Sequence, residues 1–311
     1  MPISLVTGGA GFIGSHIVDM LVARGDKVRV LDNLATGHHH NLQQVADKIE
    51  FIEGDIRNEA VVQKAVKDVE FIFHLAALVS VPQSMQQPVE AELINAVGTL
   101  NVLNAAKASG VRRLVLSSTC AVYGDEPTLP KIETMQPRPK SPYAVSKQTA
   151  EYYCQLYHDL MGLETVILRY FNIYGPRQDP SSVYSGVISI FVDKMMQNSA
   201  PFIYGDGQQT RDFVFVKDVA RANLMAAEEV TAAGQVFNIG TGRQITINHL
   251  FNTLRAIFNN NLEPVYKEAR AGDILHSYAD ATQAQKVLSW SAQVSFEEGL
   301  KQLVGSVTAA N

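Results

Sequence analysis

The chain of 311 residues is 46% hydrophobic and 18% charged, and it is long enough to bury a sizeable core in one or two domains. Its formal charge of −5 gives no general electrostatic basis for binding nucleic acid or an anionic membrane. The two cysteines supply neither a disulfide framework nor metal-ligand spacing, and no apolar run approaches the ~18 residues that span a bilayer. With no leader-like start either, we expect a cytoplasmic protein without a metal site.

A glycine-rich turn follows the first expected strand, residues 3–7, and leads into an apolar helix. Gly8, Gly11 and Gly14 form the pattern G-x-x-G-x-x-G between strand and helix, which is the context that a dinucleotide fingerprint requires. Gly8 allows the tight turn, Gly11 the approach of a pyrophosphate, and Gly14 close packing of the helix on the strand. The helix N-terminus attracts phosphate through its N–H groups and dipole. A turn without a ligand is the weaker alternative.

A second strand, residues 27–31, ends at Asp32. A carboxylate there can accept hydrogen bonds from the adenosine ribose diol and repels a 2′-phosphate. No arginine follows closely, and residues 33–37 offer only neutral partners. We therefore predict NAD rather than NADP, although Asp32 could also be a simple turn residue.

Strands and helices continue to alternate until Pro176, which predicts an α/β fold with a doubly wound parallel (Rossmann) sheet. Beyond Pro176 the strict alternation breaks down, which indicates a smaller C-terminal substrate-binding lobe. We expect the NAD-binding domain at 1–175, with 212–240 returning to it, and the lobe at 176–211 and 241–311. The further strands that we expect in the sheet are 49–53, 71–75, 112–116, 163–168 and 236–240.

Tyr143 and Lys147 are four residues apart and would share one face of a helix. A phenol normally keeps its proton to about pH 10, but a neighbouring ammonium favours the phenolate. Tyr143 is therefore a candidate general base near neutral pH. The pattern Y-x-x-x-K is weak by itself, because a tyrosine and a lysine four apart on a helix need have no function.

Several motifs occur together and in order along the chain. They are Thr7–Gly14, Asp55-Ile56, His74–Ala77, Ser117–Gly124 and Tyr143-x-x-x-Lys147. This combination resembles the extended short-chain dehydrogenases/reductases, and within them the nucleotide-sugar 4-epimerases. The resemblance covers nearly the whole chain, to about Trp290, and implies an NAD-dependent UDP-sugar 4-epimerase, an isomerase of the EC 5.1.3 type.

The resemblance implies a catalytic triad. Tyr143 matches the catalytic tyrosine, and Lys147 matches the lysine that holds the nicotinamide ribose and lowers the pKa of the phenol. Thr119 matches the hydroxyl that binds the reacting sugar oxygen, with Ser118 as the alternative if the register slips by one. The cofactor-binding residues that we expect are Gly8, Gly11, Phe12, Ile13, Gly14, Asp32, Asn33, Thr36, Gly37, Asp55, Ile56, Leu75, Ala76, Ala77, Asn95, Tyr143, Lys147 and Tyr170.

The residues after Thr119 separate branches of the family. The 4,6-dehydratases usually carry an Asp-Glu pair there to eliminate water, and the decarboxylating branch usually has an acidic residue near this position. This chain has Cys120 and Ala121, which cannot act as that acid and base. Epimerisation needs no extra acid, so the resemblance favours the epimerases.

In the epimerases the segment R-Y-F-N closes over the nicotinamide, and its Asn, here Asn172, touches the substrate diphosphate. The resemblance places Tyr204 beside the uracil, Arg211 and Arg270 at the diphosphate, and Asp273 at the uridine ribose. Two guanidinium groups that each donate two hydrogen bonds suit one dianionic diphosphate. Considered alone, each arginine is as readily explained by a surface salt bridge. The expected substrate-binding residues are Ser80, Thr119, Tyr143, Asn172, Val187, Tyr204, Arg211, Arg270, Asp273 and Ser277.

Ser277 bears on the choice of sugar. In glucose-restricted relatives a bulky Tyr commonly stands here, and a small residue leaves room for a 2-acetamido group. Residues 80–84 and 178–180 also resemble the branch that accepts N-acetylated sugars. We expect turnover of UDP-GlcNAc and UDP-GalNAc, alongside UDP-glucose and UDP-galactose.

Two other functions remain open at this stage. One is a nucleotide-sugar dehydrogenase or reductase that consumes external NAD+, and the other is a catalytically silent NAD-binding protein on the same fold. Relatives commonly form homodimers through the helix that carries the catalytic tyrosine. Apolar and aromatic residues at Tyr152, Tyr153, Leu156 and Tyr157 fit such an interface, and they fit packing within one subunit equally well.

Overall fold

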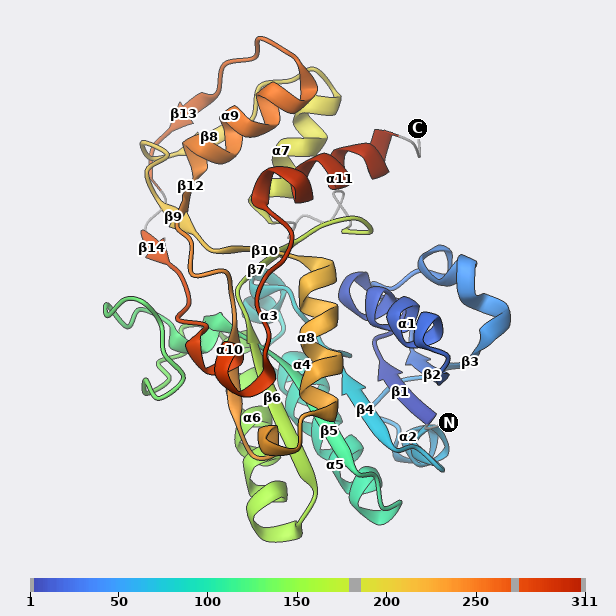
Figure 1. The fold of residues 1–311 in the computed structure, drawn as a ribbon. Helices are drawn as coiled ribbons and strands as arrows, with labels where there is room; N and C mark the ends of the chain where they lie inside the picture. The colour runs from blue at the N-terminus through green and yellow to red at the C-terminus, as the bar shows by residue number, and fades with distance from the viewer. Residues whose placement is uncertain (1–2, 179–185, 270–273, 309–311) are drawn as a thin grey trace.

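The computed structural model describes residues 3–178, 186–269 and 274–308 (Figure 1). A seven-stranded sheet lies at its centre in the order β11-β6-β5-β4-β1-β2-β3, and every neighbouring pair is parallel. The predicted doubly wound α/β fold is thereby confirmed. The strands are β1 (Ile3–Thr7), β2 (Lys27–Asp32), β3 (Ile49–Glu53), β4 (Phe71–His74), β5 (Arg113–Thr119), β6 (Glu164–Tyr170) and β11 (Val236–Ile239).

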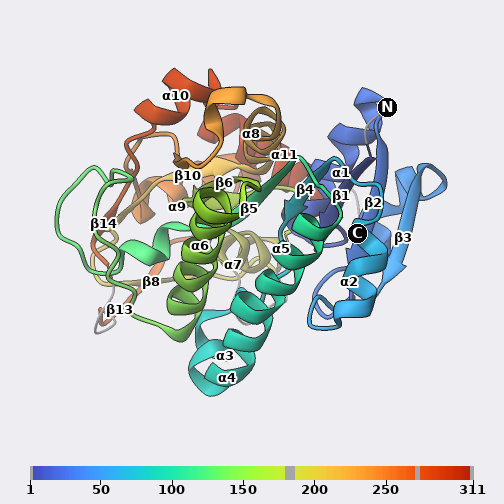
Figure 2. The same ribbon diagram turned by 90° about the horizontal axis from the view of Figure 1, so that it is seen from below.

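Helices cover both faces of this sheet, so its strands are apolar on both sides (Figure 2). Successive residues of a strand enter opposite cores: Val6 packs under α1 (Phe12–Arg24) and α8 (Val216–Glu228). Leu5 packs in the opposite core, beneath α2 (Glu59–Val66), α5 (Gly98–Ala108) and α6 (Pro142–Met161). This period of two is the pleat of the strand, and it explains why the strands read as continuous apolar runs.

A third apolar cluster forms a smaller lobe beyond the carboxyl ends of the strands (Figure 1). Its helices are α7 (Val187–Met196), α9 (Ile247–Phe258) and α11 (Phe296–Thr308). Short strands connect it to the main sheet, and sequence patterns did not reveal them because two or three residues are too few to show a period. They are β7 (Asn172–Tyr174), β8 (Phe202–Tyr204), β9 (Thr210–Arg211), β10 (Phe213–Phe215), β12 (Ile245–Thr246), β13 (Val265–Lys267) and β14 (His276–Ser277).

The chain passes between the two bodies more often than the predicted domain boundaries assume. Phe213 and Phe215, from the segment expected in the cofactor domain, belong to the core of the lobe. Conversely, α10 (Thr282–Leu288) and the buried Trp290, from the segment expected in the lobe, pack in the core beneath α8. The boundaries themselves stay a prediction.

The helical segment between β4 and β5 contains a π-helical turn. The segment consists of α4 (Pro88–Glu92), the turn η2 (Leu93–Val97) and then α5. The other short elements are α3 (Val81–Gln86) and the 3₁₀ segments η1 (His39–Lys48), η3 (Cys120–Tyr123) and η4 (Val230–Ala232). Among the described residues we find no helix that is both long and apolar enough to cross a membrane.

Arg113, at the start of β5, is fully buried and holds the end of α8. Its Nη1 donates to the carbonyl oxygens of Ala226 at 3.0 Å, Ala227 at 3.1 Å and Glu229 at 2.5 Å. The last carbonyls of a helix have no partner within the helix, so this guanidinium caps α8 from the sheet. Glu164 on β6 balances its charge at 2.7 Å.

Truncation of this cap should destabilise the fold. We expect Arg113→Ala to lower the free energy of unfolding by about 3 kcal/mol or more, because several buried carbonyls lose their donor. Urea denaturation measures the loss. Arg112→Ala is the matched control, since that guanidinium is 45% exposed and lies 3.4 Å from Glu70, and it should cost at most about 1 kcal/mol. Equal losses in the two variants would contradict the capping role.

Candidate functional site

The connections of the sheet reverse direction between β1 and β4, and a crevice opens where these two strands end. Gly8 follows β1 with φ +69°, and a Cβ atom there would lie 2.7 Å from the backbone nitrogen of Ala76. A Cβ atom at Gly14 would lie 2.2 Å from the carbonyl oxygen of Gly8. Gly11 is the N-cap of α1 and has no side chain to occupy the N–H groups of the first turn. This cradle of backbone, which any Cβ would fill, fits a dinucleotide pyrophosphate.

A hydrogen-bonded chain of buried side chains supports this crevice. The hydroxyl oxygen of Thr7 accepts from the backbone N–H groups of Leu75 and Ala76, both at 3.2 Å. His74 lies between two hydroxyls, with Nδ1 at 2.7 Å from Thr7 and Nε2 at 2.9 Å from Thr99. Burial lowers the pKa of His74 to about 3, so the imidazole is neutral. His74 is thus a packed core histidine, as its apolar surroundings in the sequence indicate.

Asp32, at the end of β2, is held by backbone groups. Its Oδ2 accepts from the N–H of Ala10 at 2.9 Å and its Oδ1 from the N–H of Leu34 at 2.8 Å. A Cβ atom at Gly37 would lie 3.0 Å from Asp32 Oδ1, so the loop passes close to the carboxylate, while Thr36 is exposed. These contacts fix the carboxylate in the place where an adenosine ribose is expected.

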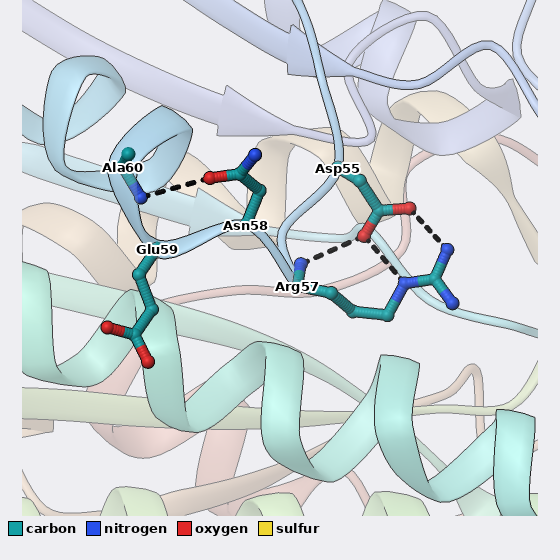
Figure 3. Close-up of a pocket in the computed structure, with 5 residues that line it drawn as sticks. All are labelled: Asp55, Arg57, Asn58, Glu59 and Ala60. Carbon is teal, nitrogen blue, oxygen red and sulfur yellow. Dashed lines mark hydrogen bonds and ion pairs between the residues drawn. The ribbon is translucent and has the colours of Figure 1, made fainter.

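Asp55, after β3, lines a hollow of about 610 Å³ that is open to solvent (Figure 3). Asn33 donates to its carboxylate at 2.9 Å, and Arg57 grips it with Nε at 2.9 Å and Nη2 at 2.8 Å. The hydrogen bonds from Arg57 lower the pKa of Asp55 to about 2, so it is ionised at neutral pH. Ile56, the next residue, is buried against the position of Gly98. The hollow adjoins the predicted adenosine end and not Tyr143.

The first turn of α6 carries Tyr143. Ser141 caps the helix by accepting from the N–H of Ala144 at 3.2 Å, and Pro142 begins the first turn. The hydroxyl of Tyr143 lies within interaction range of the Thr119 hydroxyl at the end of β5. Lys147 is buried one turn further along the same helix. The structure therefore brings Thr119, Tyr143 and Lys147 together at the carboxyl edge of the sheet.

Ser118, the alternative hydroxyl, is directed elsewhere. It is buried and donates to the carboxylate of Glu151 on α6. Thr119, by contrast, is only partly buried, and its hydroxyl interacts with that of Tyr143. The geometry therefore favours Thr119 over Ser118 as the hydroxyl that meets a substrate.

The expected lowering of the Tyr143 pKa by Lys147 does not show in this structure. Burial raises the pKa of Tyr143 to about 12, and among nearby groups the hydrogen bond from Thr119 opposes this. Burial also lowers the pKa of Lys147 to about 8, against the charge of Glu151. Removal of both groups from water therefore affects their pKa values more than their adjacency on the helix does. Ionisation of the phenol needs a further positive charge nearby.

Asn95 and Tyr170, two of the predicted cofactor-binding residues, both have protein partners for their side-chain polar atoms. Asn95, in the π-helical turn, bonds the backbone of Leu78 in both directions, at 2.7 and 3.0 Å, and donates to Ser146 at 2.9 Å. The hydroxyl of Tyr170 lies 2.9 Å from that of Ser117. Asn95 thus ties the loop after β4 to the start of α6, and the Tyr170 hydroxyl serves the core.

The other predicted substrate residues are spread over the lobe and the loop after β4. Strand pairing places Ser277 on β14 beside Arg211 on β9. Cys120 lies within electrostatic range of both Arg211 and Tyr143. The other predicted positions are Ser80 at the N-cap of α3, Asn172 on β7, Val187 at the start of α7 and Tyr204 at the end of β8, while Arg270 and Asp273 lie outside the described residues.

Sequence reasoning missed Asp212, which organises the lobe next to Arg211. It is fully buried, and its carboxylate accepts from the N–H groups of Thr241, Gly242 and Ala279 at 2.8–3.1 Å. One side chain thereby joins the loops after β11 and β14 to the strand that carries Arg211. A single aspartate between two strands gives no sequence signal for this role.

The sequence matches the NAD dependent epimerase/dehydratase family over residues 4–240. The chain belongs to this family. The resemblance to extended short-chain dehydrogenases/reductases is thereby confirmed, and NAD is the cofactor of the family, as predicted.

Relatives of this family member carry out more than one reaction. A putative UDP-glucose 4-epimerase of Methanocaldococcus jannaschii is 44% identical over 302 residues, covering 96% of both chains. UDP-glucuronic acid decarboxylase 1 of Arabidopsis thaliana is 36% identical over 305 residues, covering 96% of this chain and 68% of that protein. Sequence identity alone therefore leaves the reaction open within the family.

Solved structures resemble this family member over their whole length. A UDP-N-acetylglucosamine 4-epimerase from Methanobrevibacter ruminantium, in complex with UDP-N-acetylmuramic acid, has a TM-score of 0.96 at 38% identity, covering 100% of this chain and 99% of that one. A UDP-glucose 4-epimerase of Thermus thermophilus, in complex with NAD, has a TM-score of 0.90 at 38% identity, covering 99% and 100%.

A methyl group in the cradle should weaken cofactor binding. Gly14→Ala places a Cβ against the carbonyl of Gly8, and overpacking of this kind costs about 1–3 kcal/mol, or about 5- to 150-fold in affinity. NAD content per chain after purification and calorimetric titration of NAD measure it. Gly305→Ala in α11 meets nothing within 4 Å and is the control. Full NAD retention by Gly14→Ala would show that the cradle is not the pyrophosphate site.

Proposed function

We propose that this protein is a UDP-sugar 4-epimerase that inverts C4 of UDP-glucose and UDP-N-acetylglucosamine through a transient 4-keto sugar while retaining NAD. The observation that carries the proposal is the proximity of the Thr119 and Tyr143 hydroxyls, which interact at the edge of the sheet where the glycine cradle also opens. A base and a hydroxyl donor beside a dinucleotide site are what oxidation of a secondary alcohol requires.

In this proposal each residue of the triad has one task. Tyr143, as phenolate, accepts the proton of the sugar 4-hydroxyl, and Thr119 donates to the 4-keto oxygen. Lys147 holds the nicotinamide ribose with its ammonium. When bound, NAD+ takes up the hydride from C4, returns it to the opposite face and adds a positive charge that favours the phenolate.

The nucleotide must stay bound in one place while the 4-keto sugar rotates to present its other face. We assign this task to Arg211 and to Arg270, Asp273, Tyr204 and Asn172, as the resemblance implies. Arg211 is held at 2.8 Å by its hydrogen bond to the carbonyl of Thr210, on a strand that Asp212 anchors. Rotation about the diphosphate linkage then presents either face of the 4-keto sugar to the same hydride.

The residues after Thr119 argue for epimerisation over the other reactions of the family. Decarboxylation and dehydration need an acid or base near the sugar, and the two positions hold Cys120 and Ala121. Burial raises the pKa of the Cys120 thiol to about 12, so it offers no thiolate at neutral pH. The triad argues equally against a silent NAD-binding protein, because such a protein has no use for a paired hydroxyl and phenol.

The pairing of Ser277 with Arg211 supports acceptance of N-acetylated sugars. A small side chain beside the proposed diphosphate residue leaves space for a 2-acetamido group. Similarity to a UDP-N-acetylglucosamine 4-epimerase with UDP-N-acetylmuramic acid bound supports the same class of substrate. A cytoplasmic location remains a prediction.

Incubation of the purified protein with UDP-glucose or UDP-GlcNAc, without added cofactor, tests the proposal. We expect each substrate to give its C4 epimer by NMR, with no release of NADH. Tyr143→Phe should retain NAD and lose at least about 100-fold in kcat, because general base catalysis is worth about 10²–10⁴. Conversion of UDP-glucose alone would refute the pocket at Ser277. Absence of both conversions after NAD+ is supplied would refute the epimerase.

We also propose that the protein is a homodimer that pairs through α6 and the helix beside it. Exposed apolar side chains lie along both: Val89 and Leu93 before α5, and Tyr152, Leu156 and Leu160 on α6. The segments α4 and η2 contact α6, so these side chains form one apolar face. Of the residues named from the sequence, Tyr157 belongs instead to the core of the subunit, and Tyr153 packs against that core.

A charge on this face should separate the subunits. We expect the wild-type protein to run at twice its chain mass of 34.1 kDa in light scattering, and Leu156→Lys to shift it toward the monomer. Val265→Lys is the control, because Val265 is 44% exposed on β13 in the lobe, apart from α6 (Figure 1). A monomeric wild-type protein would refute the dimer, and an unchanged Leu156→Lys dimer would refute this face.

A further inference from the structure

Glu151 lies on the same face of α6 as the proposed catalytic pair. Tyr143, Lys147 and Glu151 follow one another at intervals of four residues, which places them in one row on the helix. Glu151 has no exposed surface, so its carboxylate is a charge inside the protein. A buried carboxylate is costly unless several groups bond it.

Two neighbouring strands supply those groups. Arg169 on β6 donates to Glu151 through Nε at 3.0 Å and Nη2 at 2.7 Å, and the hydroxyl of Ser118 on β5 donates to the same carboxylate. Ser118 and Arg169 stand opposite each other in the register of β5 and β6. The pairing of β5 and β6 thus places two hydrogen-bond donors side by side, where they bind the carboxylate of Glu151 on α6.

The arginine of this pair is itself held in place. Its guanidinium lies over the ring of Tyr123, 4.9 Å from the centroid, and its Nη1 donates to the Tyr123 hydroxyl at 3.0 Å and to the carbonyl of Glu133 at 3.2 Å. Tyr123 donates in turn to Asn238 on β11 at 2.7 Å. The position of Glu151 is therefore fixed relative to four elements of the main domain.

We propose that Glu151 is a positioning residue for the reaction, which holds the Ser118 hydroxyl away from Tyr143 and provides the counter-charge for the Lys147 ammonium. The inference rests on the proposed function. With Ser118 engaged, Thr119 is left as the hydroxyl of this run that meets the phenol. With the Glu151 carboxylate one turn away on the same helix, the buried ammonium keeps the proton that it needs to bind a ribose.

The titratable and charged groups around Lys147 define the direction in which its pKa should change when the Glu151 charge is lost. Glu151 and the thiol of Cys154, raised in pKa by burial, lie on its own helix, and the neutral His74 faces it from β4. Arg169 lies beyond Glu151 on β6. Loss of the Glu151 charge leaves Lys147 with the arginine cation only, so the pKa of Lys147 should fall.

Glu151→Gln tests this, because it keeps the shape of the side chain and removes its charge. The primary measurement is an NMR titration of the Lys147 ε-carbon in ¹³C-lysine-labelled protein, assigned with Lys147→Arg. We expect the midpoint to fall by about one pH unit or more. In the epimerase assay, the alkaline limb of the pH profile of kcat should also move to lower pH. Above this limb we expect kcat to fall about tenfold while KM stays nearly unchanged.

The titration needs no turnover, so it separates failure of this inference from failure of the proposed function. Glu164→Gln is the control, since it breaks the second Arg–Glu pair between β5 and β6, at the other end of the strands, and should leave the midpoint in place. Arg169→Gln should shift the midpoint of the Lys147 titration in the opposite direction, to higher pH. This variant provides the test if Glu151→Gln does not fold. An unchanged midpoint in either charge variant would overturn the proposal.

Discussion

The parallel direction of all seven strands is the constraint on which the site depends. Because parallel strands end at one edge, side chains that are far apart in the sequence gather there without any direct link between them. Gly8 after β1, Asp32 at the end of β2, Ala76 after β4 and Thr119 at the end of β5 meet in this way. Helix α6 then delivers Tyr143 to the same edge, so the proposed reaction lies where the cofactor site opens.

Burial of both faces of the sheet sets the electrostatics of that edge. Water is excluded from the groups behind it, so every polar side chain there needs a protein partner. His74 finds two hydroxyls, Asn95 a backbone segment, and Glu151 an arginine. The same exclusion raises the pKa of Tyr143 and lowers that of Lys147. The polar side chains behind the edge are thus held by protein partners, and burial favours the neutral form of Tyr143.

The sequence predicted the main sheet well because its signals are local. Runs such as Ile3–Thr7 have the length and apolarity of buried strands, and the structure has a strand with these bounds. The strands of the lobe were missed because pairs such as Thr210–Arg211 are too short to show any period. Asn95 and Tyr170 were assigned to the cofactor because family motifs place them near it, whereas their polar atoms bond the protein. The partners of a buried polar atom depend on packing, which no motif records.

The same reasoning shows where reactions can diverge on this fold. The pairings that hold Ser118 and Thr119 in register with β6 maintain the sheet, so they are hard to change without loss of stability. Cys120 and Ala121 come directly after the strand, in a 3₁₀ turn that no ladder constrains. An acid introduced there would face the base that is already in place, without disturbing the triad. Selection between epimerisation, dehydration and decarboxylation can therefore act on this turn and on the lobe while the catalytic edge of the sheet stays constant.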